Sequence, residues 1–201
     1  MGYAAFKMGF WHPFGPHGRE SADQIIVRKR REIEVNGWTL WSFQNRTPQM
    51  FEKWRECLTA SAEPTVLAFC SHSPEAVDPA RTGVPITPTD SQCYRLVNQT
   101  EWQPCPLGIR VPHPFRDQRR ASAFVVQEIR VDQLALPGVE WFSKEGEWRQ
   151  SQLPTRGEFL IRPGGTNPMR RRIRAVLVLR VPYLAVVSAD GVEQSSAADV
   201  P

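Results

Sequence analysis

The stretch "SADQIIVRKRREIEVNGWTLWSFQ", residues 21–44, joins a helical pattern to a strand pattern and decides the fold class. Ser21 and Gln24 have the spacing of a capping box, in which each side chain satisfies a free amide at the start of a helix. Asn36-Gly37 supplies residues that end helices in the left-handed conformation. The stretch therefore predicts a helix that begins at Ser21, followed directly by a strand over residues 38–44.

The predicted strand is apolar on both faces. Successive side chains of a strand point to opposite sides, so its two tryptophans cannot serve the same surface. A strand of this kind is usually internal to a sheet that is covered on both sides, and at least one indole is therefore core. One face carries Trp38, Leu40 and Ser42, and the other carries Thr39, Trp41 and Phe43.

The rest of the chain adds one more helix and many short strands. Thr47-Pro48 has the cap and first-turn residues of a second helix, and the strand expected at 64–70 makes a crossover after it. Further strands are expected at 3–11, 93–98, 107–111, 122–131 and 170–187, with a hairpin that turns at Gly146. The fold class is α+β: a curled mixed sheet or small partly closed β-barrel with two N-terminal helices.

Length and charge fit one basic domain. We expect a single α+β domain over residues 1–188 and a flexible acidic tail over 189–201. The net charge of the chain is +4; the tail carries −3, which leaves +7 on the domain. Such an excess steers a protein toward polyanions.

Several classes of protein are disfavoured. No apolar run reaches the roughly 20 residues that a membrane span needs, and the start "MGYAAF" lacks the features of a secretory or myristoylation signal. We therefore expect a cytoplasmic protein with no membrane partner. The four cysteines form no C-x-x-C pair and the four histidines repeat no zinc spacing, so we expect reduced thiols, no metal and no cofactor.

Three arginine-rich clusters are candidate phosphate contacts, because the planar guanidinium makes paired hydrogen bonds to oxyanions. One lies at residues 28–31, where interleaved glutamates favour a solvated face, and a second includes Arg116, Arg119 and Arg120. The third follows the glycine-containing loop "RPGGTNPM", whose glycines allow backbone amides to approach a ligand. It consists of Arg170, Arg171, Arg172 and Arg174.

Aromatic residues of the early sheet are candidates for stacking on a nucleobase. Single-stranded nucleic acids bind rings with about 1–3 kcal/mol per base, and flipped bases are also held between aromatic side chains. Trp38 or Trp41 would stack, and Ser42 and Gln44 would read the base edge. Trp11 and Phe14 would frame the same pocket; packed core rings are the alternative for each aromatic residue.

Two other functions stay open. His17 and Glu20, beside a glycine-rich loop, are the one local pair suited to acid–base catalysis, which indicates a small hydrolase or nuclease. Glu140 and Lys144 are an isolated further pair. The long loop over residues 71–92 indicates a protein-interaction domain instead, because loops of this length are functional or disordered.

The order of elements, the aromatic strand after a capped basic helix, and the strand "FVVQEIRV" together resemble the PUA-like superfamily, over residues 3–188. Within it the chain is similar to EVE and ASCH domains, although the G-x-K-x-x-E-x-R-like signature of ASCH domains is absent. The resemblance implies a curled barrel that binds RNA or DNA, with a modified base held in an aromatic pocket. The sequence therefore predicts a nucleic-acid-binding module.

Overall fold

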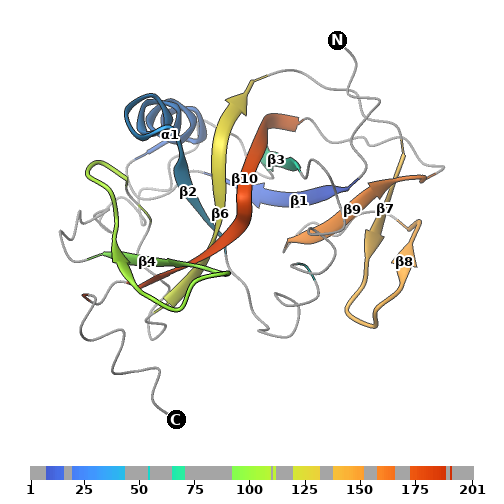
Figure 1. Ribbon diagram of the computed structural model, residues 1–201. Coiled ribbons are helices and arrows are strands. Elements are labelled where there is room, and N and C mark those ends of the chain that lie inside the picture. The colour runs from blue at the N-terminus through green and yellow to red at the C-terminus, as the bar shows by residue number, and fades with distance from the viewer. Residues whose placement is uncertain are drawn as a thin grey trace, which may run out of the picture.

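The structure is a computed structural model that describes residues 8–15, 20–43, 54, 65–70, 92–109, 111, 120–131, 138–151, 158–165, 173–188 and 191. The described part is mostly β-sheet with one long helix, an α+β arrangement (Figure 1). Its elements in chain order are β1 (Gly9–Phe14), α1 (Ala22–Asn36), β2 (Thr39–Phe43), β3 (Thr65–Cys70), β4 (Cys93–Leu96), β5 (Gln103–Pro104), β6 (Arg120–Arg130), β7 (Val139–Phe142), β8 (Trp148–Arg149), β9 (Phe159–Pro163) and β10 (Ile173–Ser188).

The helix α1 begins and ends as its sequence predicts. The Ser21 hydroxyl accepts a hydrogen bond from the Gln24 amide at 3.2 Å, and the Gln24 side chain accepts one from the Ser21 amide at 2.8 Å. Gly37 has a φ of 76°, and its amide donates to the Ile33 carbonyl at 2.7 Å. Both ends of the helix therefore satisfy backbone groups that would otherwise lack partners.

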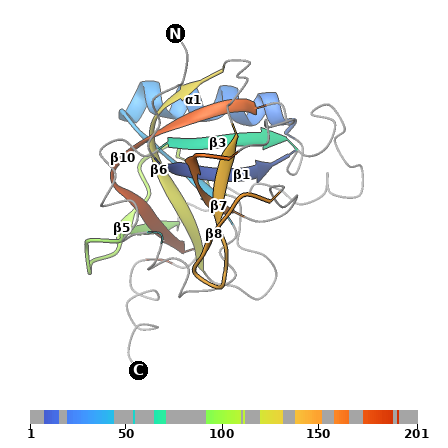
Figure 2. The same ribbon diagram turned by 90° about the vertical axis from the view of Figure 1, so that its right-hand side faces the viewer.

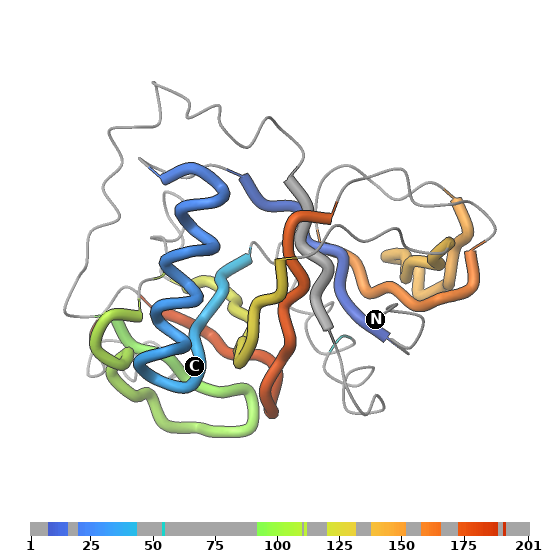
Figure 3. The backbone as a smooth tube through the Cα atoms, turned by 90° about the horizontal axis from the view of Figure 1, so that it is seen from above, coloured from blue at the N-terminus to red at the C-terminus, as the bar shows by residue number. Residues whose placement is uncertain are grey.

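The strands form one mixed sheet in the order β2-β6-β10-β3-β1-β9-β7-β8; β4 also pairs with β10, and β5 pairs with β4. The pair β1–β3 is parallel, and the other described pairs are antiparallel. Seen from above, α1 lies at one end of this arrangement and the β7–β8 hairpin lies at the other (Figure 3). The hairpin turns at Gly146, as the sequence predicts, and this glycine has a φ of 89°, in the left-handed region.

Strand β10 changes partner along its length. Its first half lies between β3 and β6, and its second half lies between β4 and β6. The change follows a break in register between Leu179 and Leu184, where four residues of β10 stand against one of β6. Val181 lies two residues after the buried Leu179, yet it is 68% exposed because this bulge interrupts the alternation of side chains.

The core lies on both sides of β2. On one side Trp41 and Phe43 pack with Phe10 and Phe124, and on the other side Leu40 packs with Tyr94. The predicted division of the strand into two covered faces is therefore confirmed. However, β2 is an edge of the described strand order, so its cover comes from α1 and from the curl of the sheet, visible in Figure 2.

Two predictions about the fold are wrong, and a third falls outside the described residues. Three successive antiparallel pairs link β2 to β3, so these strands run in opposite directions and no crossover joins them. The parallel connection runs from β1 to β3. The segment expected as a strand at 107–111 starts with a turn, in which Leu107 is 92% exposed. Of the second predicted helix, the structure describes Trp54, which is buried.

Candidate functional site

A chain of three buried polar side chains crosses the interior of the curled sheet. The indole nitrogen of Trp41 on β2 donates a hydrogen bond to Nε2 of His12 on β1 at 3.0 Å. Nδ1 of the same imidazole lies 3.3 Å from Oε1 of Glu158, without the alignment of a hydrogen bond. Because Nε2 accepts, the neutral His12 ring carries its proton on Nδ1, toward the carboxylate. This contact ties β2 to β1 across the core.

Burial excludes two of the rings that the sequence nominates for base stacking. Trp41 is 4% exposed and Trp11 is 0% exposed, so neither offers a face to a ligand. Phe14 meets Trp41 edge-on, with ring centres 5.4 Å apart. Trp11 alternates with His12 along β1 and therefore points to the other side of the strand. The pocket expected from these rings is instead packed core.

The other nominated residues do not gather at one place. Ser42 is partly exposed on β2, whereas Gln44, Arg170, Arg171 and Arg172 lie outside the described residues. Arg174, at the start of β10, donates to Asp23 of α1 at 2.5 Å, so its charge is already paired. Of the four arginines in the third cluster, the structure therefore describes Arg174.

The glycines before that cluster are explained by packing. A Cβ on Gly165 would lie 2.4 Å from the carbonyl oxygen of Val139, closer than any side chain tolerates. The amide of Gly164 donates to the Gly138 carbonyl at 3.2 Å. Glycine is needed here because the loop runs against the backbone of the β7 strand.

Trp38 is the nominated indole that keeps partial exposure. It precedes β2 and packs on Tyr94 of β4, with ring centres 5.3 Å apart. The Tyr94 hydroxyl donates to the Gln103 side chain at 3.0 Å, which fixes the ring. Burial raises the pKa of Tyr94, and the nearby Arg180 guanidinium opposes that rise. An aromatic pair and an exposed cation therefore lie within electrostatic reach of one another.

The register of the sheet explains why these residues meet. Thr39, Val126 and Leu179 form one row across β2, β6 and β10. Trp38 precedes the first member of this row and therefore lies on the opposite face, where it meets Tyr94. Arg180 follows the last member and begins the interrupted stretch of β10, and its charge acts on Tyr94, where it opposes the rise in pKa that burial causes. We call Trp38, Tyr94 and Arg180 the Trp38 surface.

Two of the four basic residues of α1, Arg28 and Lys29, are paired with carboxylates. Arg28 donates to Glu20 at 2.7 and 2.9 Å and to Glu32 at 2.7 Å. Lys29 is 2% exposed, and its ammonium donates to the second oxygen of Glu32 at 2.8 Å. The hydroxyl of Thr39 also donates to that oxygen. Burial lowers the pKa of Lys29 to about 8, although the Glu32 charge opposes the shift.

These contacts also bear on the catalytic candidates. Both carboxylate oxygens of Glu20 accept hydrogen bonds from Arg28, and His17 lies outside the described residues. Glu140 accepts hydrogen bonds from Gln150 at 2.8 Å and from Arg162 at 2.7 Å. Among the described residues, histidine, cysteine and carboxylate side chains form no group of three that would hold a metal.

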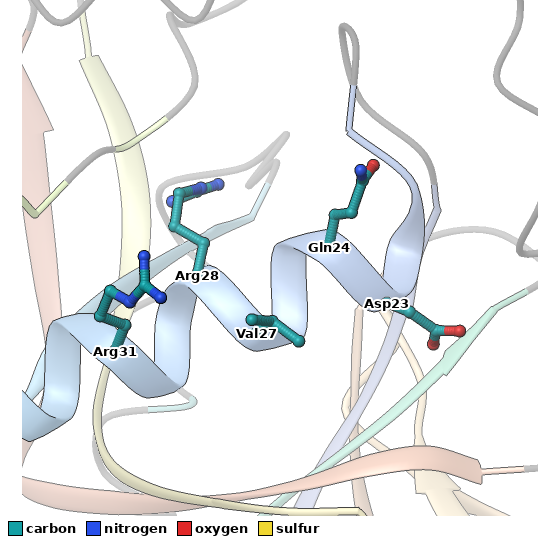
Figure 4. A pocket seen from close by; sticks show the side chains of 5 residues that line it. All are labelled: Asp23, Gln24, Val27, Arg28 and Arg31. Carbon is teal, nitrogen blue, oxygen red and sulfur yellow. The ribbon is translucent and has the colours of Figure 1, made fainter.

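A shallow depression of about 390 Å³ lies over the outer face of α1. Figure 4 shows that its lining side chains all project from this one helix. Arg28 among them is already bound to two carboxylates, and no second element supplies a converging polar group from the described residues. The depression is therefore a groove between helix side chains and not a ligand site. Its lining residues are Asp23, Gln24, Val27, Arg28 and Arg31.

Comparisons with protein-family models, with curated proteins and with solved structures find no match to this chain. Within the part of the chain that the structure describes, no helix is both long enough and apolar enough to cross a bilayer. The fold and the Trp38 surface are therefore the basis for a functional proposal.

Proposed function

We propose that the protein is a nucleic-acid-binding module of the PUA-like kind, in which a base stacks at the Trp38 surface. Trp38 supplies the ring, and Arg180 on the last strand supplies a cation for the neighbouring phosphate. The observation that carries the proposal is the partly exposed Trp38 ring, held with a ring-centre distance of 5.3 Å against Tyr94, on which the charge of Arg180 acts.

The energetics of stacking favour this surface over the rest of the early sheet. A base that stacks on an aromatic side chain gains about 1–3 kcal/mol. Tyr94 and its hydrogen bond to Gln103 hold Trp38 in place, so little rotamer entropy is lost on binding. Trp41 has no comparable face to offer, because its ring is sealed and its indole nitrogen is bound to His12.

The charges of the described residues indicate local contacts more than a broad basic field. Many arginines on the described surface are bound to neighbouring carboxylates; they are Arg28, Arg130, Arg149, Arg162 and Arg174. An ion pair has no net charge at long range, so these residues contribute little to steering. Affinity is therefore expected to come from stacking at Trp38 with a few phosphate contacts.

Fluorescence anisotropy with labelled single-stranded RNA and DNA oligonucleotides tests the proposal. Trp38→Ala should weaken binding by the stacking energy of one base, about 1–3 kcal/mol. Arg180→Gln should weaken binding and reduce the salt dependence by about one phosphate contact. Trp141→Ala and Arg130→Gln are matched controls, because both residues are partly or fully exposed and lie on other strands. Equal binding by wild type and Trp38→Ala would contradict the proposal.

Recognition of a modified or extruded base is a finer part of the same proposal. Modified and unmodified nucleosides, used as competitors against the oligonucleotide, should differ in potency if the Trp38 surface discriminates between them.

The two alternative functions, a small hydrolase or nuclease and a protein-interaction domain, have less support. Glu20 is occupied by Arg28, which disfavours catalysis by His17 and Glu20. Residues 71–91 of the loop nominated for a protein partner lie outside the described residues.

A further inference from the structure

The contact between Trp41 and His12 closes the curl of the sheet. Three strands, β6, β10 and β3, stand between β2 and β1 in the strand order. A flat sheet would hold β2 and β1 about 19 Å apart. The indole nitrogen of Trp41 nevertheless lies 3.0 Å from Nε2 of His12. The two side chains therefore meet across the interior, and their hydrogen bond joins strands that are not neighbours in the described sheet.

Only a neutral imidazole can make this hydrogen bond. The indole N–H is a donor that cannot accept, so Nε2 of His12 must accept with its lone pair. A protonated histidine carries a hydrogen on both ring nitrogens and accepts at neither. Uptake of one proton by His12 therefore turns the contact with Trp41 from a hydrogen bond into two opposed N–H groups.

Glu158 favours the protonated ring, which Trp41 opposes. Strands β1 and β9 are antiparallel neighbours, and continuing their register by one residue places His12 opposite Glu158. Nδ1 of His12 lies 3.3 Å from Oε1 of Glu158, and the two side chains are 5% and 8% exposed. In the described part of the chain, His12 is the one basic group within ion-pair distance of this carboxylate. A buried carboxylate beside a neutral ring lacks a compensating charge, and a proton on His12 would supply it.

The other elements around this contact present apolar groups or charges that are already paired. On β6 the neighbour of His12 is the ring of Phe124, which lies edge-on with ring centres 5.8 Å apart. On β3 the titratable residue is Cys70, which pairs with β1 two residues beyond His12. On α1 the buried charges are Lys29 and Glu32, which bind each other at 2.8 Å and contact β2 through its first residue. Among the described residues, the carboxylate that precedes β9 is therefore the charged group that faces the imidazole.

We propose that His12 is a proton-operated latch between β1 and β2. The neutral ring accepts from Trp41 and holds the curl closed. The protonated ring pairs with Glu158 and releases Trp41, so β2 loses its attachment to β1. A single proton thus selects between two arrangements of the core. The latch does not depend on what the Trp38 surface binds, because its three side chains all lie outside that surface.

A titration from about pH 8 to about pH 5, the range in which histidine ordinarily changes charge, tests the latch by NMR of the tryptophan indole N–H signals. The Trp41 signal, assigned with Trp41→Phe, should move on acidification. Its hydrogen exchange should quicken about tenfold or more, because the bond that protects it is lost. The Trp141 signal, from β7, is the internal reference and should stay in place. The movement of the Trp41 signal should reverse when the pH is raised again.

Three variants separate the parts of the latch. His12→Gln keeps an acceptor for Trp41 and removes the titrating ring, so its Trp41 signal should not move. His72→Gln is the matched control and should behave as wild type. Glu158→Gln removes the charge that stabilises the protonated ring, so the movement should shift to lower pH by about one pH unit.

Nitrogen-15 NMR of the His12 ring in the wild-type protein gives a second measurement that does not require any variant to fold. A hydrogen on Nε2 of the neutral ring would overturn the proposal. A Trp41 signal that stays in place while the ring takes up its proton would do the same, as would a ring that stays neutral throughout the titration. Simultaneous loss of all indole signals would show global unfolding in place of a local latch, and would also overturn it.

Discussion

Replacement of Trp41 by alanine should destabilise the protein far more than the same replacement of Trp38. Truncation of a large buried aromatic ring costs about 3–5 kcal/mol. Loss of the indole donor also leaves Nε2 of His12 buried without its partner, at a further cost of about 1–3 kcal/mol. The two contributions overlap, so we expect at least about 4 kcal/mol, a large share of the 5–15 kcal/mol typical of a folded domain.

Urea unfolding followed by circular dichroism measures this difference. Trp38→Ala should cost about 1–2 kcal/mol, because its ring is only partly covered. Trp41→Phe keeps most of the ring and removes the donor, so it should cost about 1–3 kcal/mol and isolate the hydrogen bond to His12. A cost below about 2 kcal/mol for Trp41→Ala, or equal costs at the two positions, would refute the assignment of Trp41 to the core.

The remaining predictions concern a buried cation and a close backbone contact. Because the folded protein lowers the pKa of Lys29 to about 8 from an ordinary value of 10.5, the unfolded chain holds more protons between these values, and the free energy of unfolding should rise with pH across this window. Urea unfolding at pH values inside and below the window should show this rise in wild type relative to Lys29→Met. A difference in the free energy of unfolding between the two proteins that stays the same at every pH would contradict it. Gly165→Ala should cost about 1–3 kcal/mol or more, since its Cβ would meet the Val139 backbone. Gly15→Ala is its control, having open space around the added carbon, and equal melting temperatures of the two variants would show that the contact at Val139 is unimportant.

Local patterns account for the parts of the fold that the sequence predicts correctly. The ends of α1 follow from Ser21, Gln24 and Gly37, whose side chains or backbone freedom act within one helical turn. The buried face of β10 follows from alternation as far as Leu179 and fails at Val181. Pro182 lies inside the interrupted stretch and was its local sign, because proline within a sheet is confined to edges and bulges, whereas the partners of β10 on either side depend on distant strands.

The functional residues were harder to predict because they meet through the fold. The sequence showed that Trp38 and Trp41 point to opposite faces, but both faces are covered, and only the surroundings of each ring distinguish core from surface. His12 lies on β1 and Glu158 immediately precedes β9, far away in sequence, so spacing gave no indication of their contact. The polar His12 between Trp11 and Pro13 in an otherwise apolar strand was the one local sign of a buried partner.

The exchange of neighbours along β10 has a consequence for how the chain folds. Without residues 173–188 the described strands separate into three ribbons: β2 with β6, β4 with β5, and β3 with β1, β9, β7 and β8. Each ribbon would present unpaired backbone edges, which are templates for association with other chains. During synthesis the sheet therefore closes only after its last strand has left the ribosome, and nascent chains halted before that point should be prone to aggregate.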